Sequence, residues 1–174
     1  AIDVPLIASL NGASRGGWVH SARSLQDAGA AALELNIYYV SGDLTLGGND
    51  VEQRHLDILQ AVKSEVSIPV AVKLSPYFSS VGAMCQQLDR AGADGLVLFN
   101  RFLQPDIDLE RLEVVSGVTL SSPVDARLPR TWIAVLHDHV EASLAASSGV
   151  DQPEDVVKYL LAGADVVCTT SALV

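Results

Sequence analysis

The sequence predicts an α/β fold with a parallel sheet, and two observations carry that prediction. The first is a tripeptide, Ala-Gly-Ala, which recurs at 28–30, 91–93 and 162–164 and is followed each time by an apolar or β-prone run. Glycine relieves Cβ strain where a helix ends in left-handed geometry, so each copy indicates a helix that ends just before a strand. The second is that the apolar runs are nearly continuous, as in parallel strands covered on both faces.

The spacing of the tripeptides indicates how many elements lie between them. Successive copies begin at residues 28, 91 and 162, which are 63 and 71 positions apart. Each interval holds about two strand-plus-helix units of roughly 30 residues, the length that a parallel crossover needs. The expected strands are Pro5–Leu10, Ala32–Ile37, Pro69–Leu74, Gly95–Phe99, Ser143–Ala146 and Asp165–Thr169.

Helix start signals lie between these strands. Ser79 and Ser80 precede an amphipathic stretch, while Asp151, Pro153 and Glu154 form a capping-box pattern. Residues of these types satisfy backbone N–H groups that have no partner inside the helix. We therefore expect a helix to begin at each of the two places.

Two longer segments complete the expected order of elements. A helix from about Asn49 to Glu65 has apolar residues on one face and a solvated charged face that includes Glu52 and Arg54. The segment from Arg101 to Pro129 is longer than the connection of roughly 2 to 6 residues that is usual in α/β proteins. Excursions of this length are commonly functional, so we expect this one to shape a site.

The composition is that of a globular chain. Of the 174 residues 49% are hydrophobic and 18% are charged, so we expect one domain with a buried core over residues 1–174. Acidic residues outnumber basic ones by 21 to 11, and the formal charge of −10 disfavours nucleic acid as a partner, because binding it needs positive charge to displace counterions. No apolar run approaches the roughly 18 to 20 residues of a membrane span, so no membrane partner is expected.

The cysteines bear on metal binding and on location. Cys85 and Cys168 lie 83 positions apart and belong to no cluster of metal ligands, so no metal site is expected. We expect buried thiols in a reducing compartment, which predicts a cytoplasmic protein. No basic segment precedes the first apolar run, so no export signal is indicated.

Polar residues collect where the expected strands end. In parallel α/β folds the active site lies at the carboxyl ends of the strands, so these side chains should meet at one mouth. For any single residue an ordinary solvated strand end explains the polarity equally well, but the recurrence favours a site. The residues are Asn11, Asn36, Lys73, Asn100, Ser147, Ser148, Thr169, Thr170 and Ser171.

Lys73 is the one charged residue within its apolar strand run. Its ammonium should be partly desolvated unless it meets an anion or a carbonyl oxygen, which indicates a functional environment. Two alternatives remain open, namely a structural ion pair and a Schiff-base lysine made nucleophilic by a lowered pKa.

Small hydroxyl-bearing residues follow the last two expected strands, at 146–149 and 169–171. They let backbone N–H groups approach an anion at a helix start, and in a (β/α)₈ barrel this is the usual place of a phosphate site. Ser and Thr also dominate ordinary turns and caps, so this signal alone is not specific.

A rival function is carried by residues 12–16, which match the G-x-S-x-G pattern of serine hydrolases. Ser14 would be the nucleophile, with His137 or His139 as its base. A match at three fixed positions arises easily by chance, so this is the less favoured alternative and Ser14 is interpreted as a turn or cap residue. His137 and His139 do not share a helix face, which indicates a surface helix end rather than a metal site.

Four motifs in order then indicate a family. They are AGAAALELNIYY, IPVAVKLSPYFSS, GADGLVLFN and AGADVVCTTSALV, and the likeness covers about residues 5 to 174. The chain resembles the FMN-dependent dihydroorotate dehydrogenases of class 1 and the related domain of dihydropyrimidine dehydrogenase. The resemblance implies a (β/α)₈ barrel, of which this chain would carry about strands 3 to 8, truncated at both ends as a fragment.

The resemblance also implies an activity and a set of site residues. The activity is transfer of a hydride from a small cyclic amide-like substrate, oxidised at a CH–CH group, to FMN. Lys73 would contact the flavin ring, and the asparagines would hold flavin or substrate amides, which agrees with the pairing ability of these side chains. The implied residues are Asn36, Lys73, Asn100, Ser148, Gly149, Thr170 and Ser171 for the cofactor, and Asn11, Asn36 and Asn100 for the substrate.

One stretch departs from the family pattern. Where the family has Ser-Cys-Pro-Asn after Leu-Asn, with Cys or Ser as the general base, this chain has Tyr38, Tyr39, Val40 and Ser41. A phenol is a poor base at neutral pH, so we expect a divergent paralogue with a changed substrate. Tyr39 and Lys73 are its candidate catalytic residues. A second reading is a non-catalytic or flavin-binding subunit of a redox complex. The expected partners are a small-molecule substrate and either a second copy or a redox subunit.

Overall fold

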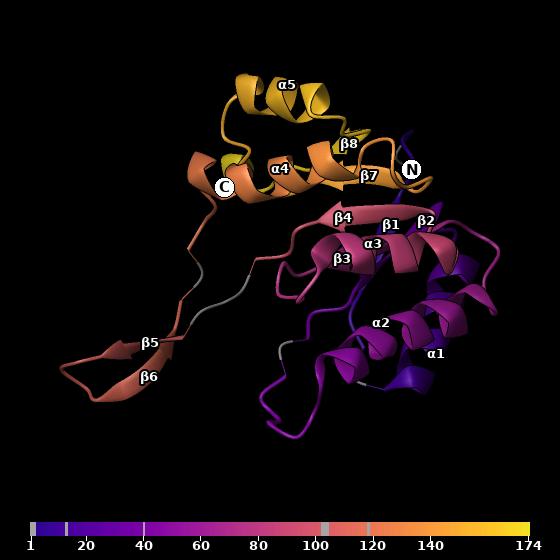
Figure 1. Ribbon diagram of the computed structural model, residues 1–174, viewed down its shortest axis with the longest axis horizontal. Coiled ribbons are helices and arrows are strands. Elements are labelled where there is room, and N and C mark those ends of the chain that lie inside the picture. Colours follow the sequence, from indigo (N-terminus) through magenta and orange to yellow (C-terminus); the bar gives the residue numbers. More distant parts are fainter. Residues whose placement is uncertain (1–2, 13, 40, 102–104, 118) are drawn as a thin grey trace.

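Six parallel strands form one curled sheet, in the order β1-β2-β3-β4-β7-β8 (Figure 1). The structure is a computed structural model that describes residues 3–12, 14–39, 41–101, 105–117 and 119–174. Every expected strand is confirmed, although five of the six are one to three residues shorter than the apolar run. The strands of this sheet are β1 (Ile7–Leu10), β2 (Ala32–Asn36), β3 (Val70–Leu74), β4 (Gly95–Leu98), β7 (Ser143–Ala146) and β8 (Val166–Val167).

Helices connect consecutive strands and cover one side of the sheet (Figure 1). This strand-helix alternation, with each strand beside its predecessor, is the arrangement of a (β/α)₈ barrel that is not closed in this chain. The repeated tripeptides end helices as expected, because Gly29, Gly92 and Gly163 have φ values of +96°, +94° and +103°. The helices are α1 (Arg15–Asp27), α2 (Gly48–Lys63), α3 (Val81–Arg90), α4 (Arg127–Leu136) and α5 (Pro153–Leu161), with short 3₁₀ turns η1 (Pro123–Ala126) and η2 (Ser171–Leu173).

The core lies between the sheet and its helices. Alternate residues of β2 and β3, such as Leu35 and Val72, are fully buried on the helix side. The residues between them, Glu34, Asn36 and Lys73, are half-buried and lie on the opposite face, here called the inner face. The expectation of strands covered on both faces therefore fails for β2 and β3, because none of the described helices covers the inner face, whereas all four residues of β4 are buried.

The predicted helix starts are partly confirmed. Ser80 is the N-cap residue of α3. The capping box of α5 is shifted by one residue from the prediction: Gln152 is the N-cap, and the Asp155 carboxylate accepts hydrogen bonds from the backbone N–H groups of Gln152 and Asp151 at 3.1 and 3.2 Å. These bonds stabilise the carboxylate and lower the pKa of Asp155.

The long excursion after β4 contains a hairpin that the sequence did not predict. Strands β5 (Pro105–Asp108) and β6 (Glu113–Ser116) pair antiparallel and project away from the main sheet (Figure 1). Ile107 and Val114 face each other across this hairpin and are both exposed. The chain then returns through η1, which leads directly into α4.

Both cysteines carry free thiols. Cys85 is buried, and burial raises the pKa of its thiol to about 12, whereas Cys168 is only half-buried. Within the described part of the chain, none of the helices is long and apolar enough to cross a membrane.

His55 is a buried polar residue of the α2 core. Its imidazole is 1% exposed, its Nδ1 donates to the backbone carbonyl of Val51 at 2.8 Å, and its ring lies edge-on to Phe78 at 5.1 Å between centroids. Burial penalises the charged imidazolium and lowers the pKa of His55 below its usual value of 6.5.

This burial predicts a pH-dependent stability. As pH falls from about 7 to 5, the free energy of unfolding should decrease, because the unfolded chain takes up a proton on His55 before the folded chain does. Denaturant titrations over this pH range should show a flatter slope for His55→Gln than for wild type. The exposed His20 is the matched control, since His20→Gln should keep the wild-type slope, and equal slopes in wild type and His55→Gln would contradict the prediction.

Candidate active site at the carboxyl ends of the strands

Two asparagines predicted from the strand ends lie in contact. Asn36 is the last residue of β2, and Asn100 follows β4 by two positions. The Asn100 Nδ2 donates to the Asn36 Oδ1 at 2.6 Å although the residues are 64 positions apart in the chain. The backbone N–H of Asn100 also donates to the carbonyl of Leu74 at 2.7 Å, which fixes the residue at the end of β3. The sheet therefore places two amides side by side at its carboxyl edge.

Lys73 lies next to this pair, on the inner face of β3 and opposite Asn36 in the strand register. Its Nζ is 3.8 Å from the Glu34 Oε1, and the two side chains are 22% and 15% exposed. Of the alternatives left open for Lys73, the structure shows the ion pair. Sequence reasoning missed Glu34, although its position two residues before Asn36 places it on the same face of β2.

Cys168 contributes a thiol near the same ion pair. Burial raises the pKa of this thiol, the negative charge of Glu34 raises it further, and the positive charge of Lys73 opposes both. The thiol is therefore neutral at ordinary pH. Cys168 follows β8, the last strand of the sheet, and the charges of Glu34 on β2 and Lys73 on β3 both act on its thiol.

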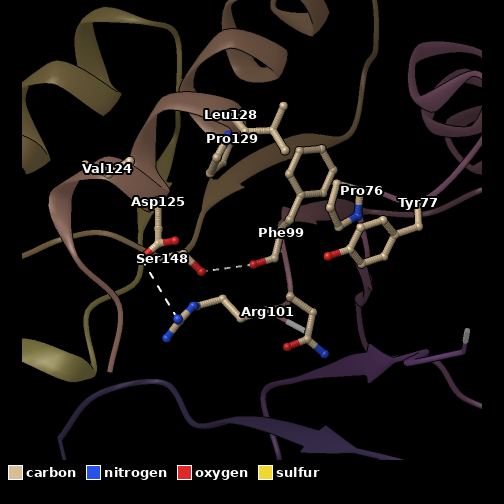
Figure 2. Close-up of a pocket in the computed structure, with 10 residues that line it drawn as sticks. Pro76, Tyr77, Phe99, Arg101, Val124, Asp125, Leu128, Pro129 and Ser148 are labelled. Atoms are coloured by element: carbon tan, nitrogen blue, oxygen red, sulfur yellow. Dashed lines mark hydrogen bonds and ion pairs between the residues drawn. The ribbon is translucent and has the colours of Figure 1, made fainter. Parts of the chain in front are cut away.

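The turn after β7 has a backbone conformation that few residues adopt. Ser148 and Gly149 have φ values of +83° and +71°. The Ser148 hydroxyl donates to the carbonyl of Phe99 at 3.2 Å (Figure 2), and the Tyr159 hydroxyl donates to the carbonyl of Ser148 at 2.7 Å. Tyr159 is fully buried, and burial raises the pKa of its phenol well above the usual value. Tyr159 therefore holds the turn from the buried side, a role that the sequence did not reveal.

The predicted phosphate residues line a cavity of about 160 Å³. Ser148, Thr170 and Ser171 belong to its wall, whereas Gly149 is buried behind it. Ser171 is also tied to the returning excursion, because its hydroxyl accepts from the backbone N–H of Ser121 at 3.0 Å. The remaining wall residues are Phe99, Asn100, Arg101, Ser121, Ser147, Val150 and Cys168.

A second cavity of about 320 Å³ adjoins the first (Figure 2). Tyr77, Phe99 and Leu128 supply aromatic and apolar walls. Arg101 lines both cavities and lies 3.9 Å from the Asp125 carboxylate. The excursion from Arg101 to Pro129 thus contributes an arginine and the start of α4 to the wall of a cavity at the end of the sheet, and its part in a functional site stays a prediction.

A third cavity, of about 180 Å³, opens at the ends of β1 and β2. Asn11, Asn36, Tyr38 and Tyr39 line it together with Arg54 of α2. The Arg54 guanidinium carbon lies 4.6 Å from the centre of the Tyr39 ring, a cation–π contact. The prediction of a solvated Arg54 is therefore wrong, because the excursion of the chain after β2 brings Tyr39 over α2.

The hydrolase arrangement does not form. Ser14 is the N-cap of α1, and its hydroxyl accepts from the backbone N–H of Gly17 at 3.2 Å. His137 caps the end of α4 and lies against Gly163, which precedes β8. Ser14 follows the carboxyl end of β1, so the serine and this histidine lie at opposite ends of the sheet, and His137 marks a helix end as expected.

Comparison with known proteins shows which family the chain belongs to. A sequence model of dihydroorotate dehydrogenases matches residues 1–174. The chain belongs to the dihydroorotate dehydrogenase family. Within this family assignment, the three residues expected at the flavin, Asn36, Lys73 and Asn100, all lie at one end of one sheet.

Individual relatives agree with the assignment. The catalytic subunit of dihydroorotate dehydrogenase B (NAD(+)) from Halalkalibacterium halodurans is 32% identical over 98% of this chain and 58% of its own length. The putative dihydroorotate dehydrogenase A (fumarate) from Aeropyrum pernix is 32% identical over 99% of this chain and 57% of its own. The chain thus spans somewhat more than half the length of the curated relatives it matches.

A solved structure confirms the fold. The dihydroorotate dehydrogenase of Eimeria tenella, crystallised with ferulenol, superimposes with a TM-score of 0.64 over 92% of this chain and 50% of that one. The two sequences are 15% identical, so the likeness concerns the fold alone.

Because the Ser148–Gly149 turn is closely packed, we expect one added methyl group at Gly149 to lower the stability of the protein strongly. A Cβ at Gly149 would lie 2.4 Å from the backbone nitrogen of Ala126, and its φ is positive. Gly149→Ala should therefore destabilise the protein by about 2 to 4 kcal/mol in denaturant titrations. Gly42→Ala is the matched control, because nothing lies within 4 Å of a Cβ there, and it should change stability by less than about 0.5 kcal/mol. Equal stabilities of the two variants would show that the turn can relax.

Proposed function

We propose that the protein is an FMN-dependent oxidoreductase that transfers a hydride between a small cyclic amide-like substrate and the flavin. The observation that carries the proposal is the meeting of Asn36, Lys73 and Asn100 at the carboxyl edge of the sheet in a chain of the dihydroorotate dehydrogenase family. Bound FMN would supply the electron acceptor that amino-acid side chains lack. Residues of the chain would bind the cofactor, orient the substrate and handle the proton.

The residues at the ends of β7 and β8 fit the phosphate of such a cofactor. Hydroxyl groups of Ser148, Thr170 and Ser171 border the cavity of about 160 Å³, and Arg101 adds a positive charge to its wall. Phosphate groups are bound by this combination of small hydroxyl residues, nearby backbone N–H groups and a guanidinium. The turn is held in place before any ligand arrives, because Tyr159 and Phe99 both hydrogen-bond to Ser148.

The asparagines and the lysine would orient the reacting groups. An amide side chain offers both a donor and an acceptor, so Asn36 and Asn100 suit the edge of a planar cyclic amide. Asn11 lines the cavity of about 180 Å³ together with Asn36 and would extend the substrate contacts there. The Lys73 ammonium, on the inner face, would stabilise negative charge on the reduced flavin ring.

Tyr39 is the residue proposed to act as base. Oxidation at a CH–CH group removes a proton from the carbon next to the hydride donor, and a positioned base accelerates that step. Tyr39 is half-buried and lines the cavity that contains Asn36, so its hydroxyl can hold or relay a proton there. The phenol in place of the family's thiol or hydroxyl supports a changed substrate.

A second candidate is a flavin-binding subunit without chemistry of its own, and the Tyr38–Tyr39 replacement is the observation that favours it. Several relatives are named catalytic subunits, a name that supports a further subunit for this chain too. Of the two expected kinds of partner, we propose a redox subunit in preference to a second copy of the chain. The two free thiols support the cytoplasmic location expected from the sequence.

The first test is cofactor binding. The protein that carries this chain should purify with FMN, and Lys73→Ala should weaken FMN binding about tenfold or lower its midpoint potential, because the cation beside the ring is lost. Absorbance spectra and fluorescence titration report both effects. Lys63→Ala is the matched control, since Lys63 pairs with Asp94 at the other end of the sheet. Protein that stays colourless at high micromolar FMN would refute the proposal.

The second test concerns the base. Anaerobic stopped-flow mixing with dihydroorotate should bleach the flavin about 10² to 10⁴-fold more slowly than in a family member with the Cys or Ser base, because general-base catalysis typically contributes that factor. Tyr38→Phe and Tyr39→Phe form a matched pair. Rapid bleaching lost only in Tyr39→Phe would show that Tyr39 is an efficient base for dihydroorotate, whereas bleaching by another donor would support the changed substrate.

A further inference from the structure

The Glu34 carboxylate is approached from two neighbouring strands. The Ser9 hydroxyl of β1 donates to its Oε1 at 2.6 Å, and the Lys73 ammonium of β3 lies 3.8 Å from the same oxygen. The Glu34 side chain is 15% exposed. A carboxylate that has lost most of its water needs such partners to stay charged at low cost.

The strand register brings these residues together on neighbouring strands. Ser9 is the direct partner of Glu34 in the β1–β2 pair, and Lys73 is the partner of Asn36 in the β2–β3 pair. Glu34 and Asn36 share the inner face because side chains alternate along a strand. Backbone hydrogen bonds of three strands therefore fix the relative positions of the three residues from which the hydroxyl, the carboxylate and the ammonium extend.

We propose that Glu34, oriented by Ser9, is a positioning residue that holds the Lys73 ammonium at the inner face and partly offsets its charge. This rests on the proposed function, in which the same ammonium lies against the flavin ring. A cation beside the ring favours reduction, which adds negative charge, and an anion nearby disfavours it. Glu34 would thus set both the place of the ammonium and the net charge that the ring meets.

The neighbouring thiol does not disturb this balance. Cys168 is near enough to Glu34 and Lys73 for both to act on it, and burial first, then Glu34, raise the pKa of its thiol. It therefore stays uncharged at neutral pH and adds no charge of its own. Among Glu34, Lys73 and Cys168, the carboxylate and the ammonium therefore carry the charge.

Redox titration of the FMN-loaded protein tests the role in charge. Glu34→Gln should raise the midpoint potential and Lys73→Met should lower it, because each removes one of two opposite charges near the ring. Glu141→Gln is the matched control: it removes the same charge from an exposed residue at the amino end of β7 and should leave the potential unchanged. A potential in Glu34→Gln equal to that of wild type would overturn the role in charge.

A double-mutant cycle in the cofactor-free protein tests the role in position. We expect the two substitutions to be coupled by a factor of about three to ten in the unfolding equilibrium constant. The cycle compares the unfolding of wild type, Glu34→Gln, Lys73→Met and the double variant. Repeating the cycle in Ser9→Ala should reduce this coupling. Additive effects would overturn the positioning role. Protein that binds no FMN yet shows the coupling would overturn the proposed function and the role in charge, while leaving the positioning of Lys73 established.

Discussion

The two-residue period of the parallel strands is the constraint on which both the core and the site depend. In β2 and β3 it sends Leu35 and Val72 under the helices and leaves Glu34, Asn36 and Lys73 on the inner face. Moving either strand by one position would bury a charged residue among apolar side chains and expose leucines to water. The apolar core therefore fixes the register, and the register decides which polar residues are neighbours on the inner face.

The sequence predicted what depends on local pattern. The strands followed from apolar runs, and Asn36, Lys73 and Asn100 followed from their places at strand ends. Glu34 and Tyr159 were missed, and Arg54 was predicted to be solvated, because each makes its contact with a residue outside its own helix or strand, and no pattern within one element reveals such a contact. The β5–β6 hairpin was missed for another reason: its two strands are only four residues long and largely exposed, so neither carries a long apolar run to detect.

The Tyr38–Tyr39 stretch changes the wall of a cavity as well as its chemistry. A tyrosine ring fills far more space than a cysteine or serine side chain, and Arg54 packs against the face of the Tyr39 ring. The cavity at the ends of β1 and β2 therefore has an aromatic and cationic border. This border sets the shape and charge of the cavity independently of whether a proton is transferred there.

The excursion after β4 is anchored at both of its ends. Asn100 hydrogen-bonds to Leu74 before the chain leaves the sheet, and Ser121 hydrogen-bonds to Ser171 where the chain returns. Ala126 then packs against Gly149, so the returning segment is part of the wall of the site. The β5–β6 hairpin between these anchors supplies no described residue to the three cavities, so the anchored ends of the excursion, and not its tip, build the cavity walls.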